Sequence, residues 1–226
     1  MKIIAISDQH GNLNQIKDSC DVLVITGDWS PLCYQQNYDT MLNWCDNEFI
    51  PWMKALYTYH TIIVTCNHDI SCTYSSLSFK DDIDNLIKRH DMCDKIHYLC
   101  FDSVIIDSKK FYCNPNSDSH SLLAFSNQHN QNYEFDYDTD ILITHQPPRF
   151  GDVRLVRRFN KEFCFVDLRN EILISNISLN ICGHIHTGDH ETTHVILNNG
   201  KSAIIKNVSI LDEDYRVAYE PVIIEI

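Results

Sequence analysis

Short apolar runs alternate with helix-like stretches along the first part of the chain. Three runs rich in Ile and Val stop at polar residues, as buried β-strands do; they cover residues 2–7, 22–26 and 61–65. Apolar residues over residues 13–20, 38–57 and 81–90 are instead spaced as in amphipathic helices, which we predict there. Pro51 lies inside the middle stretch, so we expect a kink or two helices in it.

The rest of the chain is richer in strand patterns. Four short, closely spaced runs predict a meander of antiparallel strands at residues 97–101, 104–107, 110–113 and 122–125. Further strands are predicted at 141–144, 179–182 and 222–226, a helix at 163–174, and a hairpin of 194–197 with 202–206 around Asn199-Gly200. We therefore expect an α/β fold of two sheets packed face to face with helices outside, in one domain spanning residues 1–226.

Polar residues follow five of the predicted strands. They are Asp8-Gln9-His10, Gly27-Asp28, Asn67-His68-Asp69, His145 and Gly183-His184-Ile185-His186. Because the ligand crevice of an open α/β sheet lies at the carboxyl ends of its strands, we expect these groups to converge. Side chains of an extended backbone have a period of two, so each Asp-x-His or His-x-His pair offers two ligands to one side.

The five groups contain a donor set that suits transition metals. Two Asp, one Asn and four His, without a thiolate, favour Mn²⁺, Fe²⁺ or Zn²⁺ over Ca²⁺ or Mg²⁺ alone. Seven ligands are too many for one ion. They fit two divalent ions that share a bridging carboxylate, as in two-metal phosphoester hydrolases.

Composition indicates the class of substrate and the cellular location. The net charge of −13 disfavours extended nucleic acid as a partner, whereas a small phosphoester or nucleotide substrate fits it. The 10 cysteines include no Cys-x-x-Cys pair, and no apolar run is long enough to cross a bilayer. We therefore expect reduced thiols, no membrane association and a cytoplasmic location.

In chain order, the five groups resemble the motifs of the calcineurin-like metallophosphoesterase superfamily, over residues 3–187. Three segments are similar to the small branch that contains animal metallophosphoesterase-domain proteins and class III cyclic-nucleotide phosphodiesterases. They are Thr144-His145-Gln146-Pro147-Pro148, Gly183-His184-Ile185-His186 and Lys206-Asn207-Val208-Ser209-Ile210. The resemblance implies a four-layer α/β/β/α sandwich of two mixed sheets.

The resemblance also implies a role for each residue. One metal would be held by Asp8, His10, Asp28 and His186, and the second by Asp28, Asn67, His145 and His184. His68 would protonate the leaving oxygen or stabilise its charge. A metal-bridging hydroxide would attack phosphorus in line.

Two departures from the family pattern bear on this reading. Cys66 stands where the family usually has glycine before the metal-binding Asn, and we expect it to crowd the site or alter the loop. Protein serine/threonine phosphatases carry a further Asp that orients the catalytic His. Here Trp29-Ser30-Pro31 follows Asp28, so that Asp is missing, which disfavours phosphoprotein substrates.

A basic segment follows His145. One hypothesis is that Arg149, Arg157 and Arg158 bind a second phosphate or the distal part of a nucleotide; the alternative is a solvated surface that balances nearby acids. We predict a dinuclear-metal phosphodiesterase that acts on small substrates of the cyclic-nucleotide type. The alternatives are a nuclease of the same superfamily, a phosphomonoesterase and a catalytically weak metal-binding scaffold.

Overall fold

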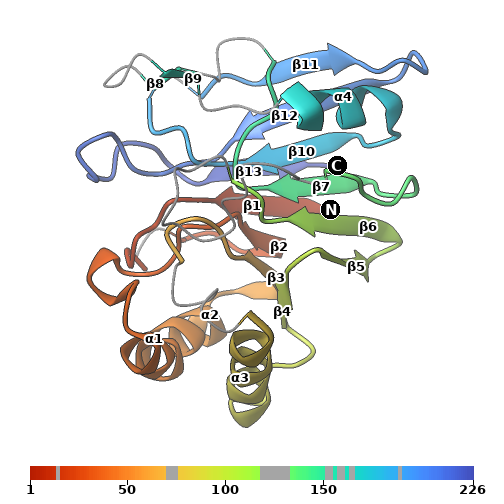
Figure 1. The fold of residues 1–226 in the computed structure, drawn as a ribbon. Helices are drawn as coiled ribbons and strands as arrows, with labels where there is room; N and C mark the ends of the chain where they lie inside the picture. Colours follow the sequence, from red (N-terminus) through yellow and green to blue (C-terminus); the bar gives the residue numbers. More distant parts are fainter. Residues whose placement is uncertain are drawn as a thin grey trace.

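The strands of the protein form two mixed sheets that lie face to face, with helices on their outer faces (Figure 1). The structure, a computed structural model, describes residues 1–13, 16–69, 76–117, 133–150, 155–156, 161–162, 166–187 and 190–226. The architecture is the α/β/β/α sandwich that the sequence predicts.

The first sheet has the strand order β13-β1-β2-β3-β4. Its parallel strands are β1 (Lys2–Ile6), β2 (Cys20–Ile25), β3 (Thr58–Val64) and β4 (Ile96–Leu99). The remaining strand, β13 (Val222–Glu225), pairs antiparallel with β1. The carboxyl ends of β1, β2 and β3 therefore share one edge of this sheet.

The second sheet has the order β11-β12-β10-β7-β6-β5. Its parallel strands are β12 (Ser202–Asn207), β10 (Leu179–Cys182), β7 (Ile141–Thr144) and β6 (Lys109–Asn114). Both edge strands, β11 (Thr193–Ile196) and β5 (Asp102–Ile106), are antiparallel to their neighbours. A separate pair is formed by β8 (Leu155–Val156) and β9 (Lys161–Glu162).

Helices supply the two outer layers. The first sheet is covered by α1 (Tyr38–Trp44), the π-helical segment η2 (Cys45–Phe49), α2 (Ile50–Ala55) and α3 (Ser76–Arg89). The second sheet is covered by α4 (Val166–Ile174). A short 3₁₀ turn, η1 (Leu32–Tyr34), lies between β2 and α1.

Alternation along the central strands fills the apolar layers on both of their faces. In β1, Ile3 and Ala5 pack into the layer between the sheets, whereas Ile4 and Ile6 pack against the helices of the first sheet. All four side chains are buried. A strand buried on both faces is a continuous apolar run, which is why β1, β2 and β7 are evident in the sequence.

Most of the predicted elements are confirmed within a residue or a few. Helix is confirmed over most of residues 38–57, where α1, the π-helical segment η2 and α2 follow one another without a gap; the irregular segment lies before Pro51, where the sequence predicts a kink or a second helix. Pro51 lies in the first turn of α2, where its missing N–H costs no intrahelical hydrogen bond. The strands at 141–144 and 179–182, the hairpin at Asn199-Gly200 and the last strand are also confirmed.

The predicted helix at residues 13–20 is wrong for the part of this range that the structure describes. Leu13 and residues 16–19 are not helical, and Cys20 begins β2. The apolar spacing has another origin, because Leu13 and Ile16 pack as half-buried side chains against the core beneath the first sheet.

The predicted meander is also wrong. β4 belongs to the first sheet, parallel to β3, while β5 and β6 form a hairpin in the second sheet. The chain therefore changes sheets between β4 and β5. Short spacing favours a meander, but strand pairing is decided by the long-range packing of both sheets. The predicted strand at residues 122–125 lies outside the described residues.

No helix among the described residues is long and apolar enough to cross a bilayer.

The layer between the sheets makes a stability prediction. Ile143 is fully buried there, so Ile143→Ala should lower the free energy of unfolding by about 2–5 kcal/mol in urea titrations, since it leaves a cavity between two rigid sheets. Ile196→Ala is the matched control, because Ile196 is 67% exposed, and should change stability by less than about 0.5 kcal/mol. Similar losses in both variants would contradict this packing.

Candidate metal centre

The loops after β1, β2, β3, β7 and β10 meet where the carboxyl ends of the two sheets come together. A short parallel bridge between Ser7 and Ser209 ties the sheets at this edge. The Ser7 amide donates to Val208 O at 2.9 Å, and the Ile210 amide donates to Ser7 O at 3.1 Å. The segment after β12 therefore crosses from the second sheet to the first beside Asp8.

The structure brings six of the predicted ligands into two adjoining groups. One group is Asp8, His10 and His186, and the other is Asp28, His145 and His184; in each, the possible ligand atoms lie within 4.8 Å of one another. Asp28 lies between the groups, because its Oδ2 is 3.4 Å from His145 Nε2 and 3.9 Å from His10 Nε2. This is the position that a bridging carboxylate would need.

Each of the two aspartates divides its oxygens between anchoring and the cluster. Asp8 Oδ2 accepts from the His184 amide at 2.9 Å and the Ser209 hydroxyl at 2.6 Å, while Asp8 Oδ1 lies 3.1 Å from His186 Nε2. Asp28 Oδ1 accepts from the His68 amide at 2.9 Å, which leaves Oδ2 toward the histidines. One oxygen of each carboxylate is thus held in place and the other faces the cluster.

Backbone carbonyls orient two of the histidines. Nδ1 of His145 donates to Thr26 O at 2.9 Å, and Nδ1 of His186 donates to Asp212 O at 3.0 Å. In both rings the proton on Nδ1 leaves Nε2 facing the carboxylates. Second partners of this kind are typical of histidines that bind metals.

The loop that carries Asn67 is held by a third buried carboxylate. Asp69 accepts hydrogen bonds from the backbone amides of Asp28 and Ser30, both at 3.1 Å, and of Cys66 at 3.0 Å. It therefore joins the loops after β2 and β3. Asp69 has a structural role that the sequence analysis did not assign, although it is the last residue of Asn67-His68-Asp69.

Glycines in the motifs make room for this packing. A Cβ on Gly183 would overlap Ser7 and lie 2.7 Å from Asp8 Oδ2. Gly27 has φ of +104°, and a Cβ there would overlap Cys66 and approach His145 Nδ1 to 2.9 Å. Only glycine fits these two positions, because the loops approach each other so closely.

Several candidate ligands have a left-handed backbone, which is uncommon for residues other than glycine. Asp8, His10, Asp28 and His184 have φ of 57°, 44°, 49° and 68°. Such conformations cost on the order of 1–3 kcal/mol each and persist only where the surrounding structure holds them. Strained residues of this kind favour a functional site at this edge of the sheets.

Charge is balanced within the cluster. Burial opposes ionisation of Asp8 and Asp28, but His186 beside Asp8 and His145 beside Asp28 outweigh it and keep the pKa of each carboxyl below its ordinary value. Burial also opposes protonation of His145 and His186, yet the carboxylates raise the pKa of each to about 9. Burial and His145 lower the pKa of His184 to about 3. The two carboxylates therefore require positive charge close by.

The donor atoms that remain fit bound cations. Nδ1 and Nε2 of His10 and Oδ1 of Asn67 are buried and form no hydrogen bond with the described residues. Buried polar atoms are almost always partnered, so these atoms call for a ligand. Imidazole nitrogen, carboxylate oxygen and amide oxygen together suit divalent transition metals.

Two further side chains support the cluster. The Cys66 thiol donates to Asp28 Oδ1 at 2.6 Å and accepts from the Asp28 amide at 2.9 Å, so the predicted crowding is replaced by a second anchor for Asp28. Burial and the neighbouring carboxylates raise the pKa of Cys66, which keeps this thiol a donor. His68 is half-buried, and its Nδ1 lies 3.4 Å from Gln35 Oε1.

The predicted basic subsite is only partly described. Arg149 is exposed, and Arg157 and Arg158 lie outside the described residues. Their role therefore stays a prediction. Besides the role of Asp69, sequence analysis missed two supporting residues, Gln35 and Ser209; Gln35 has no motif signal, whereas Ser209 lies in the tail segment that resembles the family branch.

Residues 1–188 match the calcineurin-like phosphoesterase family. The match covers most of the chain, and the chain belongs to this family of metal-dependent phosphoester hydrolases. A search of curated proteins finds no significant match.

Solved structures share the fold at low sequence identity. Phosphopantetheinyl hydrolase from Mycobacterium tuberculosis superposes with a TM-score of 0.57 at 15% identity, covering 98% of this chain and 95% of that one. A second crystal structure has a TM-score of 0.61 at 14% identity, covering 94% and 91%. A match to a novel archaeal phosphodiesterase covers 99% of this chain and 100% of that one at 13% identity, with a TM-score of 0.40, which is too low to establish a shared fold. The first two likenesses support the fold alone.

Asp69 provides a test of the loop architecture. Asp69→Ala should lower the free energy of unfolding by about 2–5 kcal/mol in urea, because the buried amides of Ser30 and Cys66 lose their acceptor and the Asp28 amide keeps only the Cys66 sulfur. Asp69→Asn should lose less, since an amide oxygen can still accept. The exposed Asp81→Ala is the control, with an expected change below about 0.5 kcal/mol. Equal losses at positions 69 and 81 would refute the anchoring role.

Proposed function

We propose that the protein is a phosphodiesterase that works with two divalent metal ions. The observation that carries the proposal is the pair of three-residue groups that meet at Asp28 Oδ2. One buried carboxylate oxygen between two sets of imidazoles is the arrangement expected for a bridged metal pair.

Two overlapping sets of residues would hold the ions. They are Asp8, His10, Asp28 and His186 for one, and Asp28, Asn67, His145 and His184 for the other. Mn²⁺, Fe²⁺ and Zn²⁺ all suit these donors, and Mn²⁺ is our first choice. When bound, the ions would supply Lewis acidity toward the phosphoryl oxygens and an activated water.

His68 is our candidate for the group that assists the leaving oxygen. It follows Asn67 directly, and its ring lies 5.3 Å from that of His10, edge to face. Gln35 Oε1 can accept the proton of Nδ1, which would direct Nε2 toward the substrate. A neutral amide orients the ring without adding negative charge, unlike the carboxylate of the phosphoprotein phosphatases.

Small diesters are the substrate class that we favour. The net charge of −13 disfavours long polyanions, and the motifs around His145 and His184 are similar to those of the branch with class III cyclic-nucleotide phosphodiesterases. Nuclease, monoesterase and scaffold readings have no specific support among the described residues and become outcomes of the experiment below.

The activity prediction uses two chromogenic substrates. With Mn²⁺, the protein should hydrolyse bis-p-nitrophenyl phosphate in preference to p-nitrophenyl phosphate. Asp28→Asn should abolish turnover, and His68→Ala should reduce kcat by about 10²–10⁴-fold if it transfers a proton. The exposed His194→Ala should be unaffected.

Other results would redirect the proposal. Preference for the monoester would identify a phosphomonoesterase, and salt-sensitive DNA cleavage would identify a nuclease. Protein that binds two metals without turning over any ester would be the scaffold.

Metal binding itself should be visible without catalysis. Because an ion that binds only the folded state adds about 2.7 kcal/mol at 100 times its dissociation constant, Mn²⁺ should raise the melting temperature by about 5–10 °C. His186→Ala should lose much of this increase, whereas His194→Ala should keep it. A wild-type protein that shows no shift with any of Mn²⁺, Fe²⁺ or Zn²⁺ would argue against the metal sites.

A further inference from the structure

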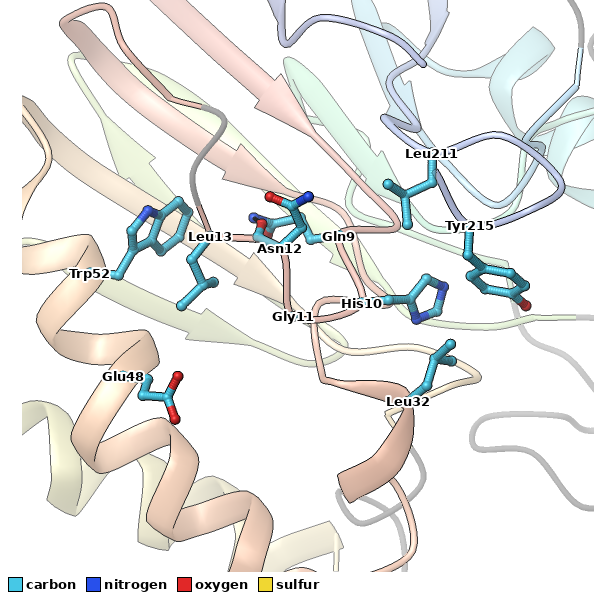
Figure 2. Close-up of a pocket in the computed structure, with 10 residues that line it drawn as sticks. All are labelled: Gln9, His10, Gly11, Asn12, Leu13, Leu32, Glu48, Trp52, Leu211 and Tyr215. Atoms are coloured by element: carbon cyan, nitrogen blue, oxygen red, sulfur yellow. Dashed lines mark hydrogen bonds between the residues drawn. The ribbon is translucent and has the colours of Figure 1, made fainter. Parts of the chain in front are cut away.

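A cavity of about 700 Å³ opens beside the candidate metal centre (Figure 2). His10 lies in its wall and is also one of the proposed ligands, so the cavity adjoins the centre. In Figure 2, His10 and Tyr215 lie on one side of the cavity. Glu48, in η2, and Trp52, in α2, lie on the other.

The wall of the cavity combines polar and apolar side chains. Gln9, Asn12 and Glu48 are polar, whereas Leu13, Leu32 and Trp52 form its apolar part; Leu32 is 44% exposed although it is large and apolar. Tyr215 continues this surface to the centre, since its ring lies 5.0 Å from that of His10. Apolar surface of this kind favours an apolar or aromatic group.

The charge of the cavity differs from that of a phosphate site. Glu48 is exposed on its wall, and none of the described lining residues is Lys or Arg. A second phosphate would therefore meet a carboxylate and no compensating cation. A neutral or cationic group avoids this repulsion.

The position of the cavity indicates which part of a diester it can take. His68, which we place at the leaving oxygen, is absent from the described lining, whereas His10 is part of it. We infer that the cavity binds the ester group that stays on phosphorus, and that this group is apolar or aromatic and uncharged or cationic, as a nucleoside or an aryl alcohol is. This inference rests on the proposed function and names the class of its substrate.

Four p-nitrophenyl phosphodiesters with the same leaving group test the inference. Their second ester groups are methyl, phenyl, 4-carboxyphenyl and 4-(aminomethyl)phenyl. With Mn²⁺, kcat/KM for the phenyl ester should exceed that for the methyl ester by about tenfold or more, because only the phenyl ring can fill the apolar wall. The aminomethyl ester should exceed the carboxy ester by about two- to fivefold at low salt, and less at high salt.

Exposed residues of the wall provide variants that should fold normally. Leu32→Ala should lower the phenyl-to-methyl ratio of kcat/KM by about three- to tenfold. Glu48→Gln should bring the rates of the two charged esters together. The controls are Ile196→Ala and Glu225→Gln, which are exposed at the opposite edge of the sheets and should change neither ratio.

Failure of the inference is distinguishable from failure of the proposed function. Metal-dependent hydrolysis with equal methyl and phenyl rates, or with a ratio unchanged by Leu32→Ala, would overturn the inference and leave the phosphodiesterase intact. If no ester is hydrolysed, calorimetry on Mn²⁺-loaded protein with phenyl methylphosphonate and its methyl analogue still tests whether the cavity prefers an aromatic ester group. Tighter binding of the phenyl compound, reduced in Leu32→Ala, would support the cavity, and equal binding would reject it.

Discussion

Asp8 and Asp28 are buried carboxylates whose charge must be compensated on all sides, and much of the surrounding edge of the molecule follows from that requirement. Each gives one oxygen to donors from neighbouring loops and turns the other toward the histidines. An unpaired buried charge is very costly, so the loops have little freedom to move apart. The same hydrogen bonds that stabilise the charges therefore also position His145 and His186 and connect the two sheets.

The rigid sheets make this arrangement possible. Left-handed backbone at Asp8, His10, Asp28 and His184 carries a conformational cost, and backbone hydrogen bonds between the loops after β1 and β2 hold part of it in place. Asp69 strengthens the constraint, because its carboxylate joins the loops after β2 and β3 through three amides. In this protein the apolar layers stabilise the fold. That stability offsets the free-energy cost of the strained, charged residues at the strand ends.

The metal centre and the adjoining cavity make different demands on a substrate. Two ionised aspartates and four histidines favour cations, and cations in turn favour a phosphate group. The described lining of the cavity beside His10 instead offers the apolar side chains of Leu13, Leu32 and Trp52 and the exposed carboxylate of Glu48. A phosphodiester with one apolar ester group suits both the metal centre and the cavity. A second phosphate would instead need a basic surface. Arg149 is exposed, and the described part of the cavity lining does not include it.

The sequence by itself determined which donor atoms the protein offers and at which strand ends they lie. Asp8-x-His10 and His184-x-His186 were evident because their spacing and the apolar strands before them are local features. Tertiary structure alone decided that β4 leaves the predicted meander for the first sheet, and that Gln35 lies beside His68. It also decided which oxygen of Asp8 faces the cluster, because that depends on Ser209, which is 201 positions away. Contacts between such distant residues leave no periodic signal, since only the closure of both sheets brings them together.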